Sequence, residues 1–417
     1  MSRKKINIGL FGFGCVGFGL YKVLERTPGL KANIRKICVK HEGKLRPLPS
    51  ALFTYDRHEI LSDPEIDVVV ELIDDPDAAF EIVSAALKSG KAVVSANKKM
   101  IAEHFQELLD LQDRYQVPLL YEAACCASIP IIRNLEEYFD TDLLESIEGI
   151  VNGSTNYILS KIFSDNRSYA AALHEAQQQG YAETNPLLDT GGFDAKYKLL
   201  ILIAHAFGVV VRPDHIYNLG IDRLADLDLR YAREKKYKIK LVAQAYKTAD
   251  ENVVCYVMPK FISQTDKLYN VDDVYNGVIT KTCFTDLQFF VGKGAGAHPT
   301  ASAVLSDLSA LTYDYRYAYK KINPDVKLVP ADEILLKVFL RFDSRSPHAF
   351  RASFQTIEEV YENQDHTYII GILTLDKIIG MLDGKNPDAS CILIEPVQHQ
   401  YEGLDSPGLQ HIDALVA

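Results

Sequence analysis

The pattern of apolar and polar positions in the first third of the chain alternates between two periods. Short apolar runs with few polar residues predict strands buried on both faces, and they cover residues 6–11, 34–39, 66–72, 92–95 and 118–121. Segments with apolar residues at helical spacing lie between these runs, notably at 78–88 and 105–115. Strands that alternate with helices in this way predict a parallel sheet covered on both faces.

The pattern changes near residue 145. A strand pattern at 145–152 runs into a polar Asn-Gly-Ser-Thr-Asn sequence, and helical patterns then dominate to about residue 245. Short strand patterns separated by polar residues follow over 253–291. The glycine cluster at 292–296 then precedes a helix that extends to residue 311. This segment is predicted to be an α+β domain with a mixed or antiparallel sheet.

The last quarter of the chain begins with a tract rich in Tyr, Lys and Asp. Residues 313–330, with prolines at 324 and 330, are predicted to be a linker. Strand patterns return at 335–342, 368–375 and 391–394, which indicates a small α+β module over residues 331–417.

Composition narrows the class of protein. The chain has 417 residues, of which 47% are hydrophobic and 24% charged, and its net charge is −11. This acidic balance argues against general binding to nucleic acid or anionic membranes, although not against a local basic site. No apolar run approaches the ~20 residues of a membrane span, and the N-terminus lacks a signal-peptide core. The seven cysteines form no CxxC pair, so we expect a cytoplasmic protein without a zinc site or disulfides.

The clearest chemical motif is Gly12-Phe13-Gly14-Cys15-Val16-Gly17, which follows the first predicted strand and opens a helix. In this context the glycines allow a tight turn and close approach of a pyrophosphate, and the helix N-terminus supplies amide groups. The motif predicts a Rossmann-type dinucleotide-binding domain; a tight turn without a ligand is the alternative.

The end of the next strand should meet the adenosine ribose of such a cofactor. An NAD site usually has an acid there, whereas this chain has Lys40. Lys40 favours a 2′-phosphate and therefore NADP. Glu42 lies near enough to reverse this preference, and a solvated Lys40 would have no part in it.

Two pairs of charged residues are further candidates. Lys98 and Lys99 follow a predicted strand, at the edge where doubly wound sheets bind ligands; a solvated lysine pair is the alternative. Asp194 and Lys198 are spaced i,i+4 and share one helix face. An inward-facing Lys198 should have a lowered pKa, which suits a proton donor, whereas an exposed ion pair is the commonest outcome of this spacing.

Together these segments resemble homoserine dehydrogenases. The resemblance covers roughly residues 5–312 and rests on GFGCVG, VVVELI, VVSANKK, YEAACCASIP, VNGSTNYIL, GYAETNP, DTGGFDAKYK and VGKGAGAHPTASAV, in the family's order. It implies NADH- or NADPH-dependent reduction of L-aspartate 4-semialdehyde to L-homoserine, in the threonine and methionine pathway, by a homodimer. It also implies an α/β fold with a Rossmann-type nucleotide-binding domain (1–145 and 294–312) and an α+β domain for substrate binding, catalysis and dimerisation (146–293).

The resemblance also implies roles for single residues. Lys198 matches the catalytic acid–base and Asp194 its partner, and Lys98 matches a catalytic lysine that bridges cofactor and substrate. Substrate contacts are implied for Glu183, Asp189, Lys98 and Ser154. Cofactor contacts are implied for Gly12, Gly14, Cys15, Val16, Gly17, Lys40, Asn97, Lys98, Gly294 and Gly296. A sodium ion, held largely by main-chain carbonyls, is implied at Glu122, Cys125, Ala127 and Ile129. A hard cation prefers oxygen ligands, so Cys125 would contribute its carbonyl rather than its sulfur.

The chain departs from the family pattern in three places. Asp74-Asp75-Pro76 replaces a glycine-rich turn and brings two acids to the expected nicotinamide site. Cys125 and Cys126 replace smaller residues; we interpret them as packing residues, with redox sensing as the alternative. Residues 331–417 have the length of an ACT regulatory domain, although 343–350 match its usual turn only loosely, so a divergent ACT-like module is predicted.

Two other functions remain compatible with these residues. One is a nucleotide-binding regulatory protein without turnover, which the acids of Asp74-Asp75-Pro76 keep open. The other is a different Rossmann dehydrogenase that acts on an amino acid or a semialdehyde, against which the set Glu183, Asp194 and Lys198 argues.

Overall fold

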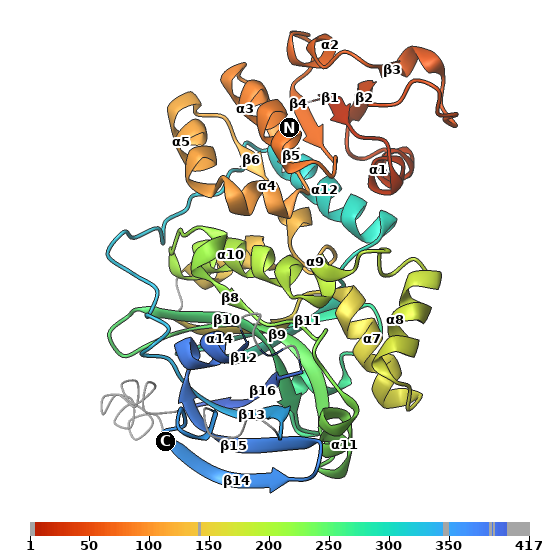
Figure 1. Cartoon of the computed structure of the whole chain (residues 1–417). Helices are drawn as coiled ribbons and strands as arrows, with labels where there is room; N and C mark the ends of the chain where they lie inside the picture. The colour runs from red at the N-terminus through yellow and green to blue at the C-terminus, as the bar shows by residue number, and fades with distance from the viewer. Residues whose placement is uncertain (1–4, 141–142, 345–349, 383–385, 387, 398–417) are drawn as a thin grey trace, which may run out of the picture.

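The computed structural model describes residues 5–140, 143–344, 350–382, 386 and 388–397. These residues form two stacked units, one built on a six-stranded sheet and one on a ten-stranded sheet (Figure 1). None of the helices in the described residues has the length and apolar character that a membrane crossing requires.

The six-stranded sheet is parallel and has the order β3-β2-β1-β4-β5-β6. Its strands are β1 (Ile6–Phe11), β2 (Ala32–Cys38), β3 (Phe53–Thr54), β4 (Val68–Glu71), β5 (Ala92–Ser95) and β6 (Leu119–Leu120). The helices of this unit are α1 (Cys15–Glu25), α2 (His58–Leu61), α3 (Pro76–Lys88), α4 (Lys98–Glu103) and α5 (Phe105–Tyr115). The predicted Rossmann-type parallel sheet is therefore confirmed, and its strand order reverses between β1 and β4, where such sheets bind their ligands.

The ten-stranded sheet begins with the antiparallel order β12-β11-β7-β9-β10. These strands are β7 (Leu144–Ile150), β9 (Lys238–Lys247), β10 (Val253–Ile262), β11 (Tyr275–Thr282) and β12 (Asp286–Lys293), with β8 (Tyr217–Asn218) beside β10. Its helices are α6 (Ile131–Glu137), α7 (Gly153–Ser164), α8 (Tyr169–Gln178), α9 (Leu187–Thr190), α10 (Phe193–Phe207) and α11 (Asp226–Glu234). The prediction of helices up to residue 245 was wrong at its end, because β9 is buried along nearly its whole length and such a run resembles a buried helix.

The C-terminal strands extend this sheet. Residues Leu335–Asp343 (β13), Thr356–Glu362 (β14), His366–Thr374 (β15) and Ser390–Pro396 (β16) have the antiparallel order β16-β13-β15-β14, with α14 (Leu375–Leu382) after β15. β16 pairs in parallel with β10 at Leu393 and Lys260. The sequence pattern missed β14, since nearly all its side chains are exposed and it lacks an apolar face. Of the turn at 343–350, residues 345–349 lie outside the described residues.

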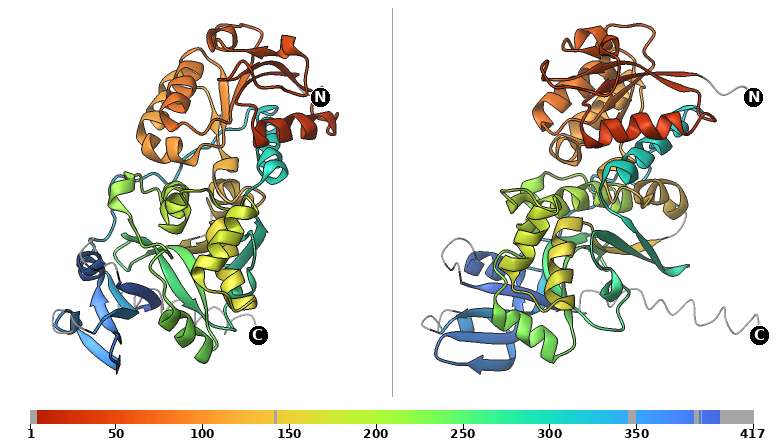
Figure 2. Two further views of the ribbon diagram at one scale, coloured as in Figure 1. Left: turned by 45° about the vertical axis from the view of Figure 1, so that its right-hand side comes forward. Right: turned by 90° about the vertical axis from the view of Figure 1, so that its right-hand side faces the viewer.

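After β12, two further segments join the units. Helix α12 (Ala297–Leu311) follows β12 and packs beside α1, as both views in Figure 2 show. The predicted linker, residues 313–330, follows α12 as an ordered segment that contacts both units. The Tyr319 hydroxyl lies 2.9 Å from that of Tyr121, which in turn lies 2.9 Å from Nε2 of His205. The tract is therefore anchored on both units rather than loosely connecting them.

Candidate active site

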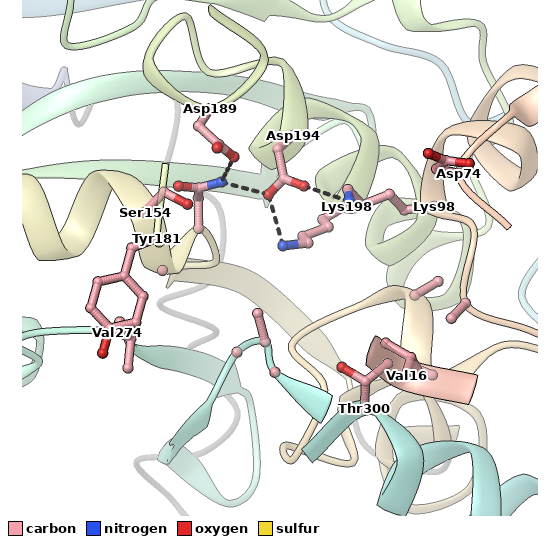
Figure 3. Close-up of a pocket in the computed structure, with 18 of the residues that line it drawn as sticks. Val16, Asp74, Lys98, Ser154, Tyr181, Asp189, Asp194, Lys198, Val274 and Thr300 are labelled. Atoms are coloured by element: carbon pink, nitrogen blue, oxygen red, sulfur yellow. Dashed lines mark hydrogen bonds and ion pairs between the residues drawn. The ribbon is translucent and has the colours of Figure 1, made fainter. Parts of the chain in front are cut away.

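A cavity of about 580 Å³ lies between the two units, at the carboxyl ends of the parallel strands (Figure 3). The six-stranded unit contributes Val16, the loop after β4 and the start of α4. The ten-stranded unit contributes the starts of α7 and α10, and the loop before α12 closes the remaining side through Gly294, Ala295 and Gly296. Helix α4 packs on α10 at this place, so the cavity is bounded by elements that also join the units.

The glycines of the GxGxxG turn differ in what surrounds them. Gly12 has φ +92°, and a Cβ there would lie 2.5 Å from the carbonyl oxygen of Leu72. A Cβ on Gly17 would lie 2.4 Å from the Gly12 carbonyl oxygen. A Cβ on Gly14, the N-cap of α1, would meet no atom within 4 Å, and no side chain caps the helix. The turn thus combines tight packing at two glycines with open space at the third, which fits a dinucleotide pyrophosphate.

This difference predicts different effects for two alanine substitutions. Gly12→Ala should destabilise the chain by about 1–3 kcal/mol, because alanine is strained at positive φ and its methyl group meets a backbone oxygen. Gly14→Ala should leave the free energy of unfolding within ~0.5 kcal/mol of the original while weakening dinucleotide binding about tenfold. Urea unfolding and fluorescence titration with a dinucleotide cofactor measure the two effects. Equal stability losses in both variants would contradict this division of roles.

A carboxylate between two lysines forms the centre of the cavity (Figure 3). Asp194 on α10 lies 2.7 Å from Nζ of Lys198 and 2.9 Å from Nζ of Lys98 on α4. Lys198 also donates a hydrogen bond to the Val151 carbonyl at 2.7 Å. The side chains of Asp194 and Lys198 are 8% and 9% exposed, so this i,i+4 pair is buried and not the exposed ion pair that the spacing alone favours.

The pKa of Lys198 in this cluster differs from the value that the sequence predicted. Burial lowers the pKa of Lys198, but the Asp194 carboxylate outweighs burial and holds that pKa above its ordinary value of 10.5. Burial likewise raises the pKa of Asp194, and the ammonium groups of Lys198 and Lys98 outweigh it and hold the carboxyl well below its usual range. The predicted fall in the Lys198 pKa was wrong, because the spacing could not show how closely a carboxylate would approach. The cluster therefore presents a protonated lysine to the cavity.

Asn152 connects this cluster to a second acid, and sequence reasoning did not single it out. Its Nδ2 donates to Asp189 at 2.7 Å and to Asp194 at 2.8 Å, while its Oδ1 accepts from the Thr155 amide and caps α7. Burial and the nearby Asp194 raise the pKa of Asp189. Ser154, in the first turn of α7, lines the same wall. An asparagine at a predicted helix start was the available signal, since capping uses one amide atom and leaves the other free.

The loop after β4 is held by Glu71, which sequence reasoning also missed. This fully buried carboxyl group accepts hydrogen bonds from the Ser95 hydroxyl at 2.6 Å and the Ile73 amide at 2.7 Å. Burial raises its pKa to about 7. Of the two acids that depart from the family pattern, Asp75 caps α3 through the Ala78 amide, whereas Asp74 lines the cavity.

Other predicted site residues are placed around the cavity. Asn97 caps α4 and donates to the Ile73 carbonyl at 3.2 Å, so it shapes the loop that lines the cavity. Lys99 turns away from Asp194 and pairs with Glu103 at 3.7 Å, which separates it from Lys98.

Several predicted residues are not part of the cavity lining, among them the glycines of the GxGxxG turn, Asn97, Glu183, Lys40 and Cys15. Glu183 is exposed on the segment after α8, near Tyr181, which does line the cavity. Lys40 is exposed just beyond β2, and Cys15 is exposed at the start of α1. The structure thus brings together Lys98, Asp189, Asp194, Lys198 and Ser154 but not Glu183.

The predicted sodium site is a buried turn. Glu122 accepts hydrogen bonds through its carboxylate from the amides of Ile132 and Arg133, both at 2.9 Å, and burial raises its pKa to about 8. Its carboxylate is thus occupied, and the described residues contain no cluster of three or more His, Cys, Asp or Glu suited to a metal. A cation there would depend on main-chain carbonyls, and the left-handed φ of +37° at Ala127 bends the backbone of this turn.

The adjacent cysteines of this turn are buried. Cys125 is fully buried and Cys126 is 1% exposed. Burial raises the pKa of Cys126 to about 11, which disfavours a reactive thiolate. This environment agrees with packing residues.

Comparisons with known proteins identify the family of the chain. The family model described as homoserine dehydrogenase matches residues 130–309, and the model of the homoserine dehydrogenase NAD-binding domain matches 12–122. The chain is 36% identical over 360 residues to homoserine dehydrogenase of Neisseria gonorrhoeae, which covers 82% of each chain. It is 37% identical over 313 residues to that of Helicobacter pylori, which covers 73% of each.

Solved structures extend the likeness to the C-terminal strands. A homoserine dehydrogenase from Thiobacillus denitrificans superposes with a TM-score of 0.83 at 30% identity, over 94% of this chain and 98% of that one. A hyperthermophilic archaeal homoserine dehydrogenase in complex with NADPH gives a TM-score of 0.66 at 27% identity, over 75% and 99%. By sequence and fold, the chain belongs to the homoserine dehydrogenase family, NAD(P)-dependent oxidoreductases that interconvert L-aspartate 4-semialdehyde and L-homoserine.

Proposed function

We propose that Lys198 is the proton donor and acceptor of this reaction, and that Lys98 and Asp194 set its charge and position. The supporting observation is the Asp194 carboxylate within 2.9 Å of both ammonium groups, in the wall of a cavity next to the dinucleotide turn. The nicotinamide cofactor, when bound, supplies the hydride. As the aldehyde oxygen gains negative charge, a neighbouring ammonium group stabilises it, and Lys198 donates the proton that completes the alcohol. In the reverse direction the neutral Lys198 amine takes that proton back.

The amino-acid end of the substrate requires both charge signs. Asp189 is proposed to meet the substrate ammonium, since its carboxylate lines the cavity and lies beside Asn152. Glu183 is proposed as a second acid, since it is only two residues from Tyr181 in the cavity wall. The first turn of the twelve-residue α7, with Ser154, supplies amide groups suited to the substrate carboxylate.

NADPH is proposed as the preferred cofactor. Lys40 is an exposed cation at the end of β2, and the Arg46 guanidinium on the same loop donates to the His41 carbonyl at 2.6 Å and lies over the Phe53 ring. Both cations suit a ribose 2′-phosphate, which the archaeal relative solved with NADPH would also need to accommodate.

This preference can be measured by homoserine oxidation with NADP or NAD. We expect kcat/KM to be at least tenfold higher with NADP, and Lys40→Ala to reduce that ratio about tenfold through loss of one charge-assisted contact. Lys44→Ala, which removes another exposed lysine of this loop, should leave the ratio unchanged. If kcat/KM with NADP and with NAD were nearly equal in the original chain, the preference for NADP would be contradicted. If a folded sample that binds the nucleotide showed no turnover with either cofactor, the proposed activity itself would be contradicted.

A sodium ion is proposed at the turn of Glu122, Cys125, Ala127 and Ile129, held by main-chain oxygens. The oxygen donors and the bent backbone of the turn support a hard monovalent cation. Replacing sodium by tetramethylammonium should lower Tm by about 2–4 °C, because a ligand that binds only the folded state stabilises it. An unchanged Tm over a wide range of sodium concentration would contradict the site.

Three further properties are proposed: the oligomeric state, the type of C-terminal module and the cellular location. Exposed Phe284, Leu287 and Val291 on and beside the edge strand β12 support a homodimer, which sedimentation at micromolar concentration would measure. The order β16-β13-β15-β14 supports an ACT-like module over 331–417, and a crystal structure of the full chain would test it. The cysteine pattern supports a cytoplasmic location, testable by cell fractionation.

A further inference from the structure

A second cavity, of about 460 Å³, lies against α10 on the side away from the candidate active site. Its walls come from the start of α10, from residues 214–218, from β10, from 328–334 and from α14. It therefore lies where the C-terminal module meets the helix that carries Asp194 and Lys198. Nothing in the reaction proposed above uses it.

The cavity is lined by the polar side chains of Asp214, His215, Tyr217 and Asn218, and by Lys196, whose side chain is largely buried. Successive α-helical residues are turned by about 100°, so Lys196 faces roughly opposite to its neighbours Asp194 and Lys198. It is only 9% exposed, and its Nζ lies 5.0 Å from the centroid of the Phe193 ring. Among the described residues no carboxylate lies within ion-pair distance of it. Asp214, the nearest counter-charge, is largely exposed and instead lies 3.6 Å from Arg212.

The Lys196 side chain is largely buried and lines the cavity, and its ammonium group has no carboxylate within ion-pair distance among the described residues, so an anionic guest in the cavity would gain a charge partner there. Burial indeed lowers the pKa of Lys196, in contrast to that of Lys198, whose carboxylate partner raises it. The opposite walls are apolar and include Ile334, Leu375 and Ile379. This combination selects a ligand with one carboxylate and a small aliphatic body.

We propose that this cavity binds a small aliphatic carboxylate, with its carboxylate on Lys196 and its aliphatic part against α14. Such a ligand is either a simple carboxylic acid or an aliphatic amino acid, whose ammonium would then meet Asp214. Both share the carboxylate that Lys196 recognises.

The cavity is connected to the active site through Asn218. This residue lines the cavity, and its Nδ2 donates to the Gly191 carbonyl at 2.7 Å. Gly191 lies in the turn between Asp189 and Asp194, where the Gly192 amide donates to the Asp189 carbonyl. Occupancy of the cavity is therefore expected to change KM for homoserine; this part of the inference rests on the proposed roles of Asp189 and Asp194, whereas the binding part does not.

Isothermal titration of the full chain tests the binding. NADPH and homoserine, which cannot react with each other, are kept saturating so that the active site is filled. Isovalerate and L-leucine are the carboxylate probes, and isoamylamine is the matched probe without a carboxylate. We expect one isovalerate or leucine per chain and no binding of isoamylamine. If only leucine binds, the ligand class is an amino acid; if isovalerate binds equally well, the carboxylate is sufficient.

Variants assign the binding to this cavity. Lys196→Met should weaken binding at least tenfold, and Lys196→Arg should retain it within about threefold, since the charge remains. Ile379→Phe, on the half-buried α14 wall, should abolish binding by filling the cavity, which keeps the test decisive if Lys196→Met fails to fold. All three should keep turnover without ligand within about twofold. Equal binding of isoamylamine, absence of binding by both carboxylates, or unchanged affinity in folded Lys196→Met and Ile379→Phe would overturn the proposal.

Discussion

Replacing Lys198 by methionine should lower kcat for homoserine oxidation by about a thousandfold or more, while the Kd for NADPH stays within about twofold. Removal of a positioned proton donor costs ~10²–10⁴ in rate, and loss of the ammonium group that stabilises the oxyanion adds to it. Nucleotide binding should persist, because the dinucleotide turn at Gly12–Gly17 is on the other unit and makes no use of Lys198. Asp194 keeps Lys98 as a partner, so the variant should fold.

Lys196→Met is the matched control, since it removes a buried lysine from the same helix on the opposite face. Its kcat should remain within about twofold. Steady-state kinetics and a fluorescence titration with NADPH measure both quantities. Retained turnover in Lys198→Met would assign the proton transfer to another group, and loss of NADPH binding would mean that Lys198 supports the cofactor site instead.

Asp194→Asn should have the second large effect, on both stability and the pH profile. Removing one partner from a buried ion pair costs about 3–5 kcal/mol, because the remaining charge is left unpaired. Without the carboxylate, burial should lower the pKa of Lys198 from its raised value. In the reductive direction, where Lys198 donates the proton, the basic limb of the pH–kcat profile should then shift to lower pH, together with a fall in kcat of about a hundredfold.

The stability loss should itself depend on pH. The folded-state pKa of Asp194 is below the ordinary 3.8, so its carboxylate contributes stability above the ordinary pKa and loses it as pH falls through the folded pKa. The difference in unfolding free energy between the original chain and Asp194→Asn should therefore be full at pH 7 and shrink below about pH 4. Urea unfolding at a series of pH values measures it. A difference that does not vary with pH would mean that the ionised Asp194 does not supply the stability.

Asp189→Asn is the control for the direction in which the stability loss changes with pH. The pKa of Asp189 is raised above 3.8 in the folded chain, so its ionisation opposes folding as pH increases. Its substitution should therefore cost little at pH 7, and less there than at low pH. A larger loss at pH 7 than for Asp194→Asn would reverse the assignment of the two acids.

Much of the fold follows from local pattern. The runs at 66–72 and 92–95 are short and mostly apolar, as expected of strands covered on both faces, and they became β4 and β5. The GxGxxG turn likewise determines its own geometry, because Gly12 and Gly17 pack against atoms only a few residues or one strand away. Local pattern failed at β14, which is exposed on both faces, and at β9, whose buried run resembles a helix.

The chemistry of the site was decided by the tertiary structure. The sequence alone determined that Asp194 and Lys198 share a helix face, since helical spacing is a local property. Only the packing of α4 on α10 brought Lys98, from a distant segment of the chain, to the same carboxylate. Lys196 and Lys198 lie on one helix, but their pKa values shift in opposite directions, because only Lys198 has a carboxylate partner in the part of the folded chain that the structure describes. Periodicity records which residues are buried, but a pKa depends on the distance to charges from distant segments, and that distance exists only in the folded chain.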